Sequence, residues 1–199
     1  NEKKFGKNVI GTFYQPDLVI SDTSFLKSLG KKEIICGYAE ILKHSLIYSM
    51  NNFNYLNRYH KEIFNLKNPY LIDAIYQSCK IKKNIVEKDE NEQKLRKILN
   101  LGHTFGHAYE AASGFGKKIN HGEGVILGIK SAIKFSLNKN YLKNKNYVKI
   151  QDHLNKLDFN LKLKNIFSKN NISSLIKFMR YDKKNTSNKI NLILLKDIG

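Results

Sequence analysis

The chain has 199 residues, 41% of them hydrophobic, and a formal net charge of +18 at pH 7. This length and apolar content support a packed domain, and because no run of about 18 apolar residues occurs, the composition excludes a membrane-spanning helix and indicates no membrane partner. The charge alone would suit a nucleic-acid binder, but only three of the 35 basic residues are arginines and the lysines are scattered without a basic arm, so we interpret the charge as a solvated surface.

The first 22 residues are predicted to lack helix. The segment NEKKFGKNVIG has no apolar stretch typical of a signal peptide and does not begin with methionine, so we expect the chain to start inside a longer gene product. Residues 9–22 indicate a loop followed by a short strand, with Pro16 marking the break.

From there to about residue 180 the pattern is mainly helical. Asp22 can cap a short helix that ends near Leu29, and apolar residues then recur at helical spacing through residues 32–50. The further helix candidates are residues 70–90, 92–113, 121–139 and 145–156. Residues 159–174 are too rich in asparagine for an assignment, and the tail INLILLKDIG indicates a strand. The sequence therefore predicts a mainly α domain with short strands at both ends.

The segment LNLGHTFGHAYE, residues 99–110, places polar side chains on an otherwise apolar helix. If residues 95–112 form one helix with about 100° per residue, a single arc of about 60° holds four polar side chains. These are Arg96, Asn100, His103 and His107. Buried polar groups need partners, so we expect this stripe to line a site. Gly102 and Gly106 cost about 1 kcal/mol each inside a helix, and they allow a second backbone or a ligand to come close.

Three histidines are candidate metal ligands. His103 and His107 have the i, i+4 spacing of a metal-binding HExxH helix, but no glutamate follows the first histidine, and a pair of satisfied core histidines is the alternative. His121 follows Asn120, which can cap a helix together with Glu123, so His121 is expected at a helix N-terminus or as part of a surface cap.

Glu40 lies inside the apolar helical segment CGYAEILKH. A buried carboxylate is costly unless it is paired or binds a metal, and an ion pair with Lys43 or a contact with His44 is the alternative. One glutamate with two histidines is typical of a catalytic Zn²⁺ site that keeps open positions. The residues alone leave open which two of the three candidate histidines are ligands.

Five segments occur in an order that closely resembles the C-terminal part of the 3-dehydroquinate synthases, in the sugar-phosphate cyclase superfamily. They are GKNVIGTFYQP (6–16), GYAEILKH (37–44), LRKILNLGHTFGHAYEAASG (95–114), NHGEGVILGI (120–129) and DKKN (182–185). The combination of GHTFGHAxE with HGE is the most specific part. The resemblance implies the helical C-terminal domain of an α/β plus all-α enzyme. Residues 1–22 would be a remnant of the N-terminal NAD-binding domain with its connecting strand, and residues 23–199 the helical metal- and substrate-binding domain.

The resemblance also implies an activity. Members of this family are carbon–oxygen lyases of the shikimate pathway, which leads to chorismate and the aromatic amino acids. They convert 3-deoxy-D-arabino-heptulosonate 7-phosphate to 3-dehydroquinate and phosphate by oxidation, phosphate elimination, re-reduction and aldol cyclisation. The implied cofactors are NAD and one divalent metal ion, zinc or cobalt, and the implied assembly is a homodimer. Because the chain has no glycine-rich dinucleotide loop, we expect a fragment that lacks most of the NAD domain and is inactive alone.

The resemblance assigns roles to individual residues. The implied metal ligands are Glu40, His103 and His121, and His107 then faces the substrate. The implied substrate-binding residues are Lys43, Lys82, Arg96, Asn100, His107, Asn8 and Lys184, of which Lys43, Arg96, Asn100 and His107 are also catalytic. Lys7 and Asn8 match positions near the cofactor. Either Lys183 or Lys184 of the DKK segment matches an active-site position, and we favour Lys184.

Two other functions fit parts of the sequence. A different sugar-phosphate cyclase or a metal-dependent polyol dehydrogenase would share the metal ligands, although Lys82, Arg96 and the DKK lysines favour a phosphorylated substrate. A basic helical module that binds nucleic acid is the alternative from another class, and we expect no nucleic-acid partner. Cys36 and Cys79 form no CxxC pair, which favours a reducing, cytoplasmic compartment.

Overall fold

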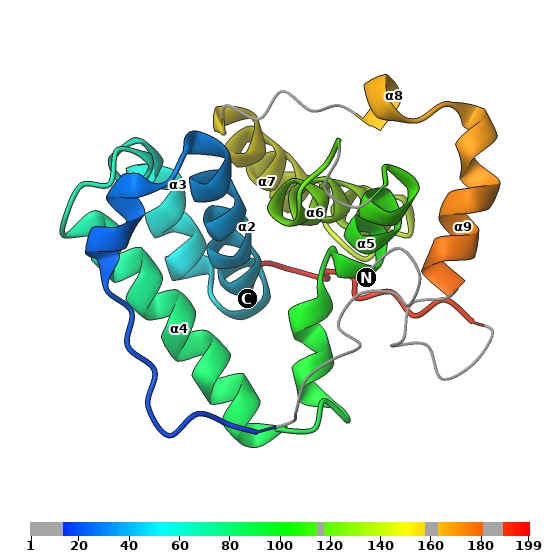
Figure 1. Ribbon diagram of the computed structural model, residues 1–199. Coiled ribbons are helices and arrows are strands. Elements are labelled where there is room, and N and C mark those ends of the chain that lie inside the picture. The colour runs from blue at the N-terminus through cyan, green and yellow to red at the C-terminus, as the bar shows by residue number, and fades with distance from the viewer. Residues whose placement is uncertain (1–13, 115–117, 158–162, 181–188) are drawn as a thin grey trace.

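The computed structural model describes residues 14–114, 118–157, 163–180 and 189–199 (Figure 1). The regular structure in these ranges is helical throughout, which confirms the predicted mainly α fold. The elements are η1 (Thr23–Ser28), α2 (Lys31–Tyr48), α3 (Met50–Phe64), α4 (Tyr70–Lys88), η2 (Leu95–Asn100), α5 (His103–Ala112), α6 (His121–Asn138), α7 (Asn144–Lys156), α8 (Leu163–Ile166), η3 (Lys169–Asn171) and α9 (Ile172–Arg180).

Helix α2 lies in the middle of the fold (Figure 1). It packs against α3 and α4 on one side and against α6 on the other, and α5 lies between α6 and α9. The main cluster of buried side chains spans α2, α3, α6 and α7, and includes Leu42, Phe53, Ile129 and Ile150, each fully buried. This core fixes α2 against α6, and therefore fixes the two sides of the site described below.

Capping residues set two of the helix starts as the sequence predicts. Asp22 accepts a hydrogen bond from the backbone N–H of Ser24 at 2.8 Å and begins η1. Asn120 accepts from the N–H of Glu123 at 2.9 Å, and the Glu123 carboxylate accepts from the N–H of Asn120 at 2.9 Å. This reciprocal pair is a capping box, and it begins α6 at His121.

The prediction of a single helix over residues 95–112 is wrong. The chain forms η2, bends at Leu101 and Gly102, and starts again as α5 at His103. Gly102 has a φ of 78°, a left-handed conformation that glycine adopts without strain. The helix expected over residues 32–50 also ends earlier, because Ser49 is extended and caps a separate helix, α3.

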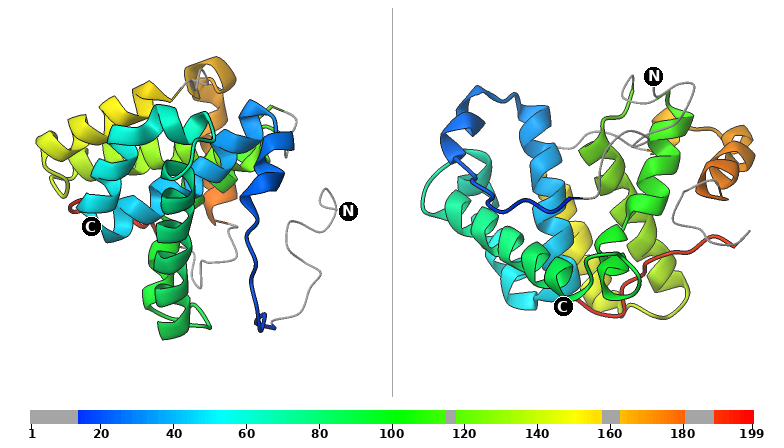
Figure 2. Two further views of the ribbon diagram at one scale, coloured as in Figure 1. Left: turned by 90° about the vertical axis from the view of Figure 1, so that its left-hand side faces the viewer. Right: turned by 60° about the horizontal axis from the view of Figure 1, so that its bottom comes forward.

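The strands expected at both ends are absent from the described residues 14–22 and 189–199. The C-terminal segment instead bonds to helices. Thr104 Oγ1 donates to the carbonyl of Asn191 at 3.2 Å, and the N–H of Leu195 donates to Ser136 Oγ at 3.2 Å. The segment runs back from α9 toward the junction of α2 and α3, where the N–H of Gly199 donates to the carbonyl of Leu46 at 3.0 Å (Figure 2). A sequence pattern for a strand cannot specify which groups its backbone will pair with.

Among the described helices, none combines the length and the apolar character that a membrane span requires.

Candidate metal centre

Glycines bring the backbones of α5 and α6 into direct contact. A Cβ atom at Gly128 would lie 1.9 Å from the carbonyl oxygen of Gly102, and one at Gly106 would lie 2.8 Å from the carbonyl oxygen of Gly124. No side chain fits at such distances, so the close approach needs glycine at these positions. The second backbone expected beside Gly102 and Gly106 is therefore that of α6, and this contact sets the distance between the first residues of α5 and α6.

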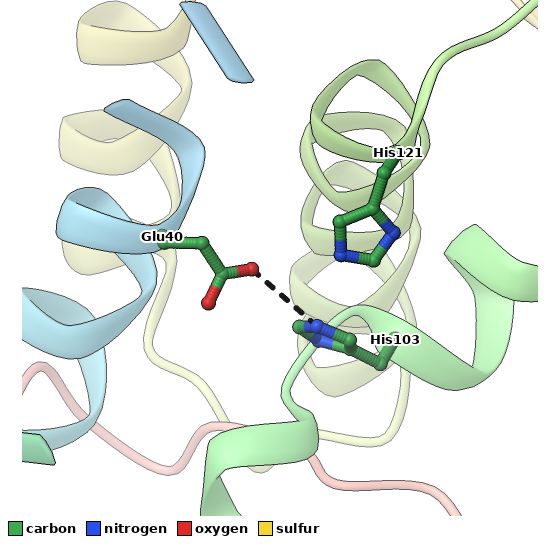
Figure 3. Close-up of side chains that lie close together, drawn as sticks. All are labelled: Glu40, His103 and His121. Carbon is green, nitrogen blue, oxygen red and sulfur yellow. Dashed lines mark ion pairs between the residues drawn. The ribbon is translucent and has the colours of Figure 1, made fainter. Parts of the chain in front are cut away.

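Three candidate ligands meet where α2, α5 and α6 converge. Glu40 comes from α2, His103 is the first residue of α5, and His121 is the first residue of α6 (Figure 3). Each offers one ligand atom, and these atoms all lie within 4.8 Å of one another. Glu40 Oε1 is 3.4 Å from His103 Nε2, and the centroids of the His103 and His121 rings are 5.5 Å apart. The three residues named by the family resemblance thus share one small volume.

The chemistry of these side chains fits a divalent cation such as Zn²⁺ or Co²⁺. Glu40 Oε1 is buried and accepts no hydrogen bond of good geometry from the described residues. Burial opposes ionisation of Glu40, but the neighbouring His103 and the charge of Lys43 outweigh it and hold the pKa of this carboxyl well below its usual range. Burial lowers the pKa of His103, which favours the neutral imidazole. An ionised carboxylate and a neutral imidazole are the forms in which these groups bind metals.

Lys43 and His44 follow Glu40 on α2 and differ in what they contact. Lys43 is buried, and its Nζ lies 2.5 Å from Glu40 Oε2, so the ion pair considered as the alternative for Glu40 is present. The pair occupies one carboxylate oxygen and leaves Oε1 facing His103. His44 turns toward α4, where its Nδ1 lies 2.7 Å from Ser78 Oγ. Burial, aided by the charge of Lys43, lowers the pKa of His44 to about 4.

His107 adjoins the three candidate ligands. Its ring centroid lies 5.4 Å from that of His103 and 5.9 Å from that of His121, and the second of these ring pairs is stacked. His107 also belongs to another group, with Glu110 and His121, whose potential ligand atoms lie within 4.8 Å of one another. The i, i+4 histidines therefore lie side by side, but each belongs to a different candidate set of ligands.

The other residues expected to contact the substrate lie on different elements of the fold. The bend at Gly102 breaks the proposed polar stripe, because Arg96 and Asn100 belong to η2 and the two histidines to α5. The guanidinium of Arg96 donates to the carbonyl of Glu90, and Asn100 Nδ2 donates to Glu92 Oε1 at 2.5 Å.

Lys82 is exposed on α4, a helix that packs against η2. Lys7, Asn8, Lys183 and Lys184 lie outside the described residues.

Two pockets adjoin α2. One of about 250 Å³ is lined mainly by apolar side chains from η1, α2 and α4, and Glu40 lies at its wall. The other, of about 420 Å³, lies between α2, α3 and α4 and is lined by none of the three candidate ligands. The convergence of ligand atoms, rather than pocket size, therefore marks this site.

Glu110 is a residue that the sequence analysis leaves without a role. It is 3% exposed on α5, and its Oε1 lies 2.9 Å from His121 Nδ1. A carboxylate three residues after His107 on an apolar helix was a signal of the same kind as Glu40.

Two family models match consecutive parts of the chain. The family model described as 3-dehydroquinate synthase C-terminal matches residues 37–185, and the one described as 3-dehydroquinate synthase N-terminal matches residues 2–36. A protein named 3-dehydroquinate synthase from Pelagibacter ubique (strain HTCC1062) is 55% identical over 196 residues, which are 98% of this chain and 53% of that protein. One of the same name from Vesicomyosocius okutanii is 42% identical over 195 residues, again 98% and 53%.

Solved structures share the fold. A 2-deoxy-scyllo-inosose synthase complexed with carbaglucose-6-phosphate, NAD⁺ and Co²⁺ superposes with a TM-score of 0.79 at 25% identity, over 98% of this chain and 53% of that one. A 2-epi-5-epi-valiolone synthase from Streptomyces hygroscopicus subsp. jinggangensis 5008, with NAD⁺ and Zn²⁺ bound, gives a TM-score of 0.81 at 19% identity, over 96% and 52%. The chain thus spans about half the length of the curated relatives it matches.

Proposed function

Because the chain belongs to the 3-dehydroquinate synthase family, we propose that it supplies the metal- and substrate-binding part of a 3-dehydroquinate synthase. The proposed reaction converts 3-deoxy-D-arabino-heptulosonate 7-phosphate to 3-dehydroquinate and phosphate. The observation that supports it most is the convergence of Glu40, His103 and His121 from three helices, with one carboxylate oxygen buried and open toward the imidazoles. Residues 1–22 are proposed as the end of an NAD-binding domain, and residues 23–199 as the helical domain.

The proposed metal ligands are Glu40, His103 and His121. A divalent cation bound there would act as a Lewis acid on a substrate oxygen. NAD is proposed as the second cofactor, since it is present in both cyclase structures that share this fold. NAD would accept and return one hydride, with Lys7 and Asn8 close to it.

The cationic side chains suit an anionic substrate. The substrate carries a carboxylate and a phosphate, and charged donors bind such groups more strongly than neutral donors. Lys43 holds a buried ammonium beside Glu40, and Lys82 presents an exposed one on the helix that packs against η2. Arg96 and Asn100 present a guanidinium and an amide on η2 itself.

The ring of His107 lies beside those of His103 and His121, and His107 is proposed to exchange a proton with the substrate. Asn8 and Lys184 complete the proposed contacts to substrate. We further propose that the complete protein is a cytoplasmic homodimer without a nucleic-acid partner.

The test uses the full gene product that contains this chain. With NAD and Co²⁺ or Zn²⁺, it is expected to release phosphate from the heptulosonate phosphate and to form 3-dehydroquinate, measured by a phosphate assay and by product chromatography. The 199-residue chain alone is expected to release none. Phosphate release from a hexose phosphate but not from the heptulosonate phosphate would instead favour another cyclase, an alternative raised by the inosose synthase structure. Oxidation of an unphosphorylated polyol would indicate a dehydrogenase.

A further inference from the structure

The two ring nitrogens of His121 face different partners. Its Nδ1 lies 2.9 Å from Glu110 Oε1, on the side away from Glu40 and His103. Its other ring nitrogen points toward those two residues (Figure 3). A neutral imidazole carries a hydrogen on one nitrogen and a lone pair on the other, so the partner of Nδ1 decides whether Nε2 can bind a metal.

Packing against α6 holds the Glu110 carboxylate beside Nδ1 of His121. The residue is 3% exposed, and its Cγ and Oε1 lie 3.1 Å and 3.2 Å from the position that a Cβ atom of Gly124 would occupy. The absence of a side chain at Gly124 thus leaves room for the carboxylate against α6. Helix α5 supplies Glu110, whereas α6 supplies both Gly124 and His121, so the close contact of these helices sets the hydrogen bond.

A carboxylate can accept a hydrogen bond but cannot donate one, whereas an amide or a hydroxyl can do both. Glu110 therefore favours the tautomer of His121 with hydrogen on Nδ1 and a lone pair on Nε2. In metal sites, a carboxylate or carbonyl that accepts from the second nitrogen of a histidine ligand fixes the tautomer and the ring orientation.

The same hydrogen bond argues against the other candidate set of ligands. A cation bound by Glu110 and by Nδ1 of His121 would have to displace the Nδ1 hydrogen that Glu110 Oε1 accepts. Nε2, by contrast, already faces Glu40 Oε1 and His103, where a buried oxygen lacks a hydrogen-bond donor among the described residues.

We propose that Glu110 is a positioning residue, which holds His121 as the Nδ1–H tautomer and directs Nε2 toward a metal ion shared with Glu40 and His103. This inference rests on the metal centre of the proposed function. It assigns Glu110 no contact with the substrate or the metal.

The experiment measures Co²⁺ affinity of the full gene product by competition with a chelator, followed by the Co²⁺ absorption spectrum. We expect Glu110→Ala to weaken Co²⁺ binding about 10- to 100-fold. Glu110→Gln keeps the side-chain volume and an acceptor oxygen, although its amide can also turn and donate, so its affinity is expected between those of the parent and Glu110→Ala. Glu87→Ala, which removes an exposed carboxylate from α4, is the matched control and should bind Co²⁺ like the parent.

A second readout reports the tautomer directly. In the metal-free protein at alkaline pH, ¹⁵N chemical shifts of His121 should show hydrogen on Nδ1 in the parent and a mixture of tautomers in Glu110→Ala. A purely structural role for Glu110 would change stability but leave this ratio unchanged.

The outcomes are distinct. Unchanged Co²⁺ affinity or an unchanged tautomer ratio in Glu110→Ala overturns the inference while the metal centre stands. If Glu110→Ala abolishes binding and Glu40→Gln does not, the ion lies at His107, Glu110 and His121, and the inference is wrong. A parent protein that binds no Co²⁺ contradicts the proposed metal centre itself, and the positioning role falls with it.

Discussion

The carboxylate of Glu40 is shared between two helices: its Oε2 lies 2.5 Å from Lys43 Nζ on α2, and its Oε1 lies 3.4 Å from His103 Nε2 on α5. Lys43 fixes the orientation of the carboxylate, because the ammonium is buried and bonded to one oxygen. The second oxygen is thereby presented to the imidazoles before any ligand arrives. Such preorganisation reduces the cost of assembling a metal site.

Replacing Glu40 by glutamine should remove the proposed ion while keeping the volume of the side chain. The amide is a weaker ligand than a carboxylate and carries no charge to offset the cation, so we expect Co²⁺ affinity to fall by about 100-fold or more. Equilibrium dialysis with metal analysis measures this. His60→Asn, on α3 and outside both candidate ligand sets, should bind one Co²⁺ like the parent. Retention of full affinity by Glu40→Gln would show that Glu40 is not a ligand.

Gly128→Ala should disrupt the contact of α5 and α6. The new Cβ would lie 1.9 Å from the carbonyl oxygen of Gly102, so the two backbones must separate, and we expect the free energy of unfolding to fall by about 2–4 kcal/mol. Gly37→Ala is the matched control within α2, because a Cβ there meets nothing within 4 Å. That substitution should raise the free energy of unfolding by up to about 1 kcal/mol, since alanine is the better helix former. Urea denaturation distinguishes the two, and equal effects would contradict the contact.

His153 should make the protein sensitive to mild acid. It is fully buried, with Nε2 2.9 Å from the Tyr38 hydroxyl, and burial lowers its pKa from 6.5 to about 3. Between these values the unfolded chain binds a proton that the folded one does not, so stability falls as pH drops below 6.5. A lowering of this size corresponds to about 2 kcal/mol lost between pH 7 and pH 5.

Urea denaturation at pH 7 and pH 5 measures this loss. His153→Gln should be less stable than the parent at pH 7 and should lose less on going to pH 5. The value at pH 7 serves as the control, because there both proteins lack the extra charge and the difference reports packing and hydrogen bonding alone. Identical losses in the two proteins would show that His153 does not couple folding to protons.

Asn120→Ala should loosen the start of α6. Asn120 Oδ1 accepts from the N–H of Glu123 and from Cys36 Sγ on α2, each at 2.9 Å, so the substitution removes a helix cap and a link between two helices. We expect the free energy of unfolding to fall by about 1–2 kcal/mol and the Co²⁺ affinity to fall with it, since His121 is the first residue of that helix. Asn120→Asp keeps the acceptor oxygens and should retain both, as thermal unfolding and dialysis can show. Equal losses in the two variants would exclude capping as the cause.

Local sequence patterns were sufficient to predict the caps of η1 and α6, because Asp22, Asn120 and Glu123 act on backbone groups two or three residues away. The cap of α3 at Ser49 was missed, since it lies inside a segment that was expected to form one helix. The bend at Gly102 was missed for a physical reason. A helical projection assumes one continuous axis, and glycine fits equally well inside a helix beside a close neighbour and at a left-handed turn. Gly102 adopts the left-handed turn and also contacts α6. The apolar pattern on either side of it therefore belongs to two elements, η2 and α5.

The C-terminal segment could not be assigned from its own residues. Its apolar composition suits a strand, but its backbone pairs with Thr104, Ser136 and Leu46, which are distant in the sequence. Glu110 was missed for the same reason, since its partner His121 lies on another helix. The metal ligands were named by family resemblance. The spacing of the residues alone left three histidines as candidates for two ligand positions. The structure brings those residues together, and their roles stay predictions until the ion is measured.

The glycine contact between α5 and α6 also limits how His103 and His121 can be grafted onto another protein. Main-chain atoms touch main-chain atoms there, so the separation of His103 and His121 does not depend on the rotamers of intervening side chains. Grafting only the ligands onto another pair of helices, spaced as ordinary side chains space them, would place the two rings too far apart. A protein engineer would have to copy Gly102, Gly106, Gly124 and Gly128 first, and the ligands second.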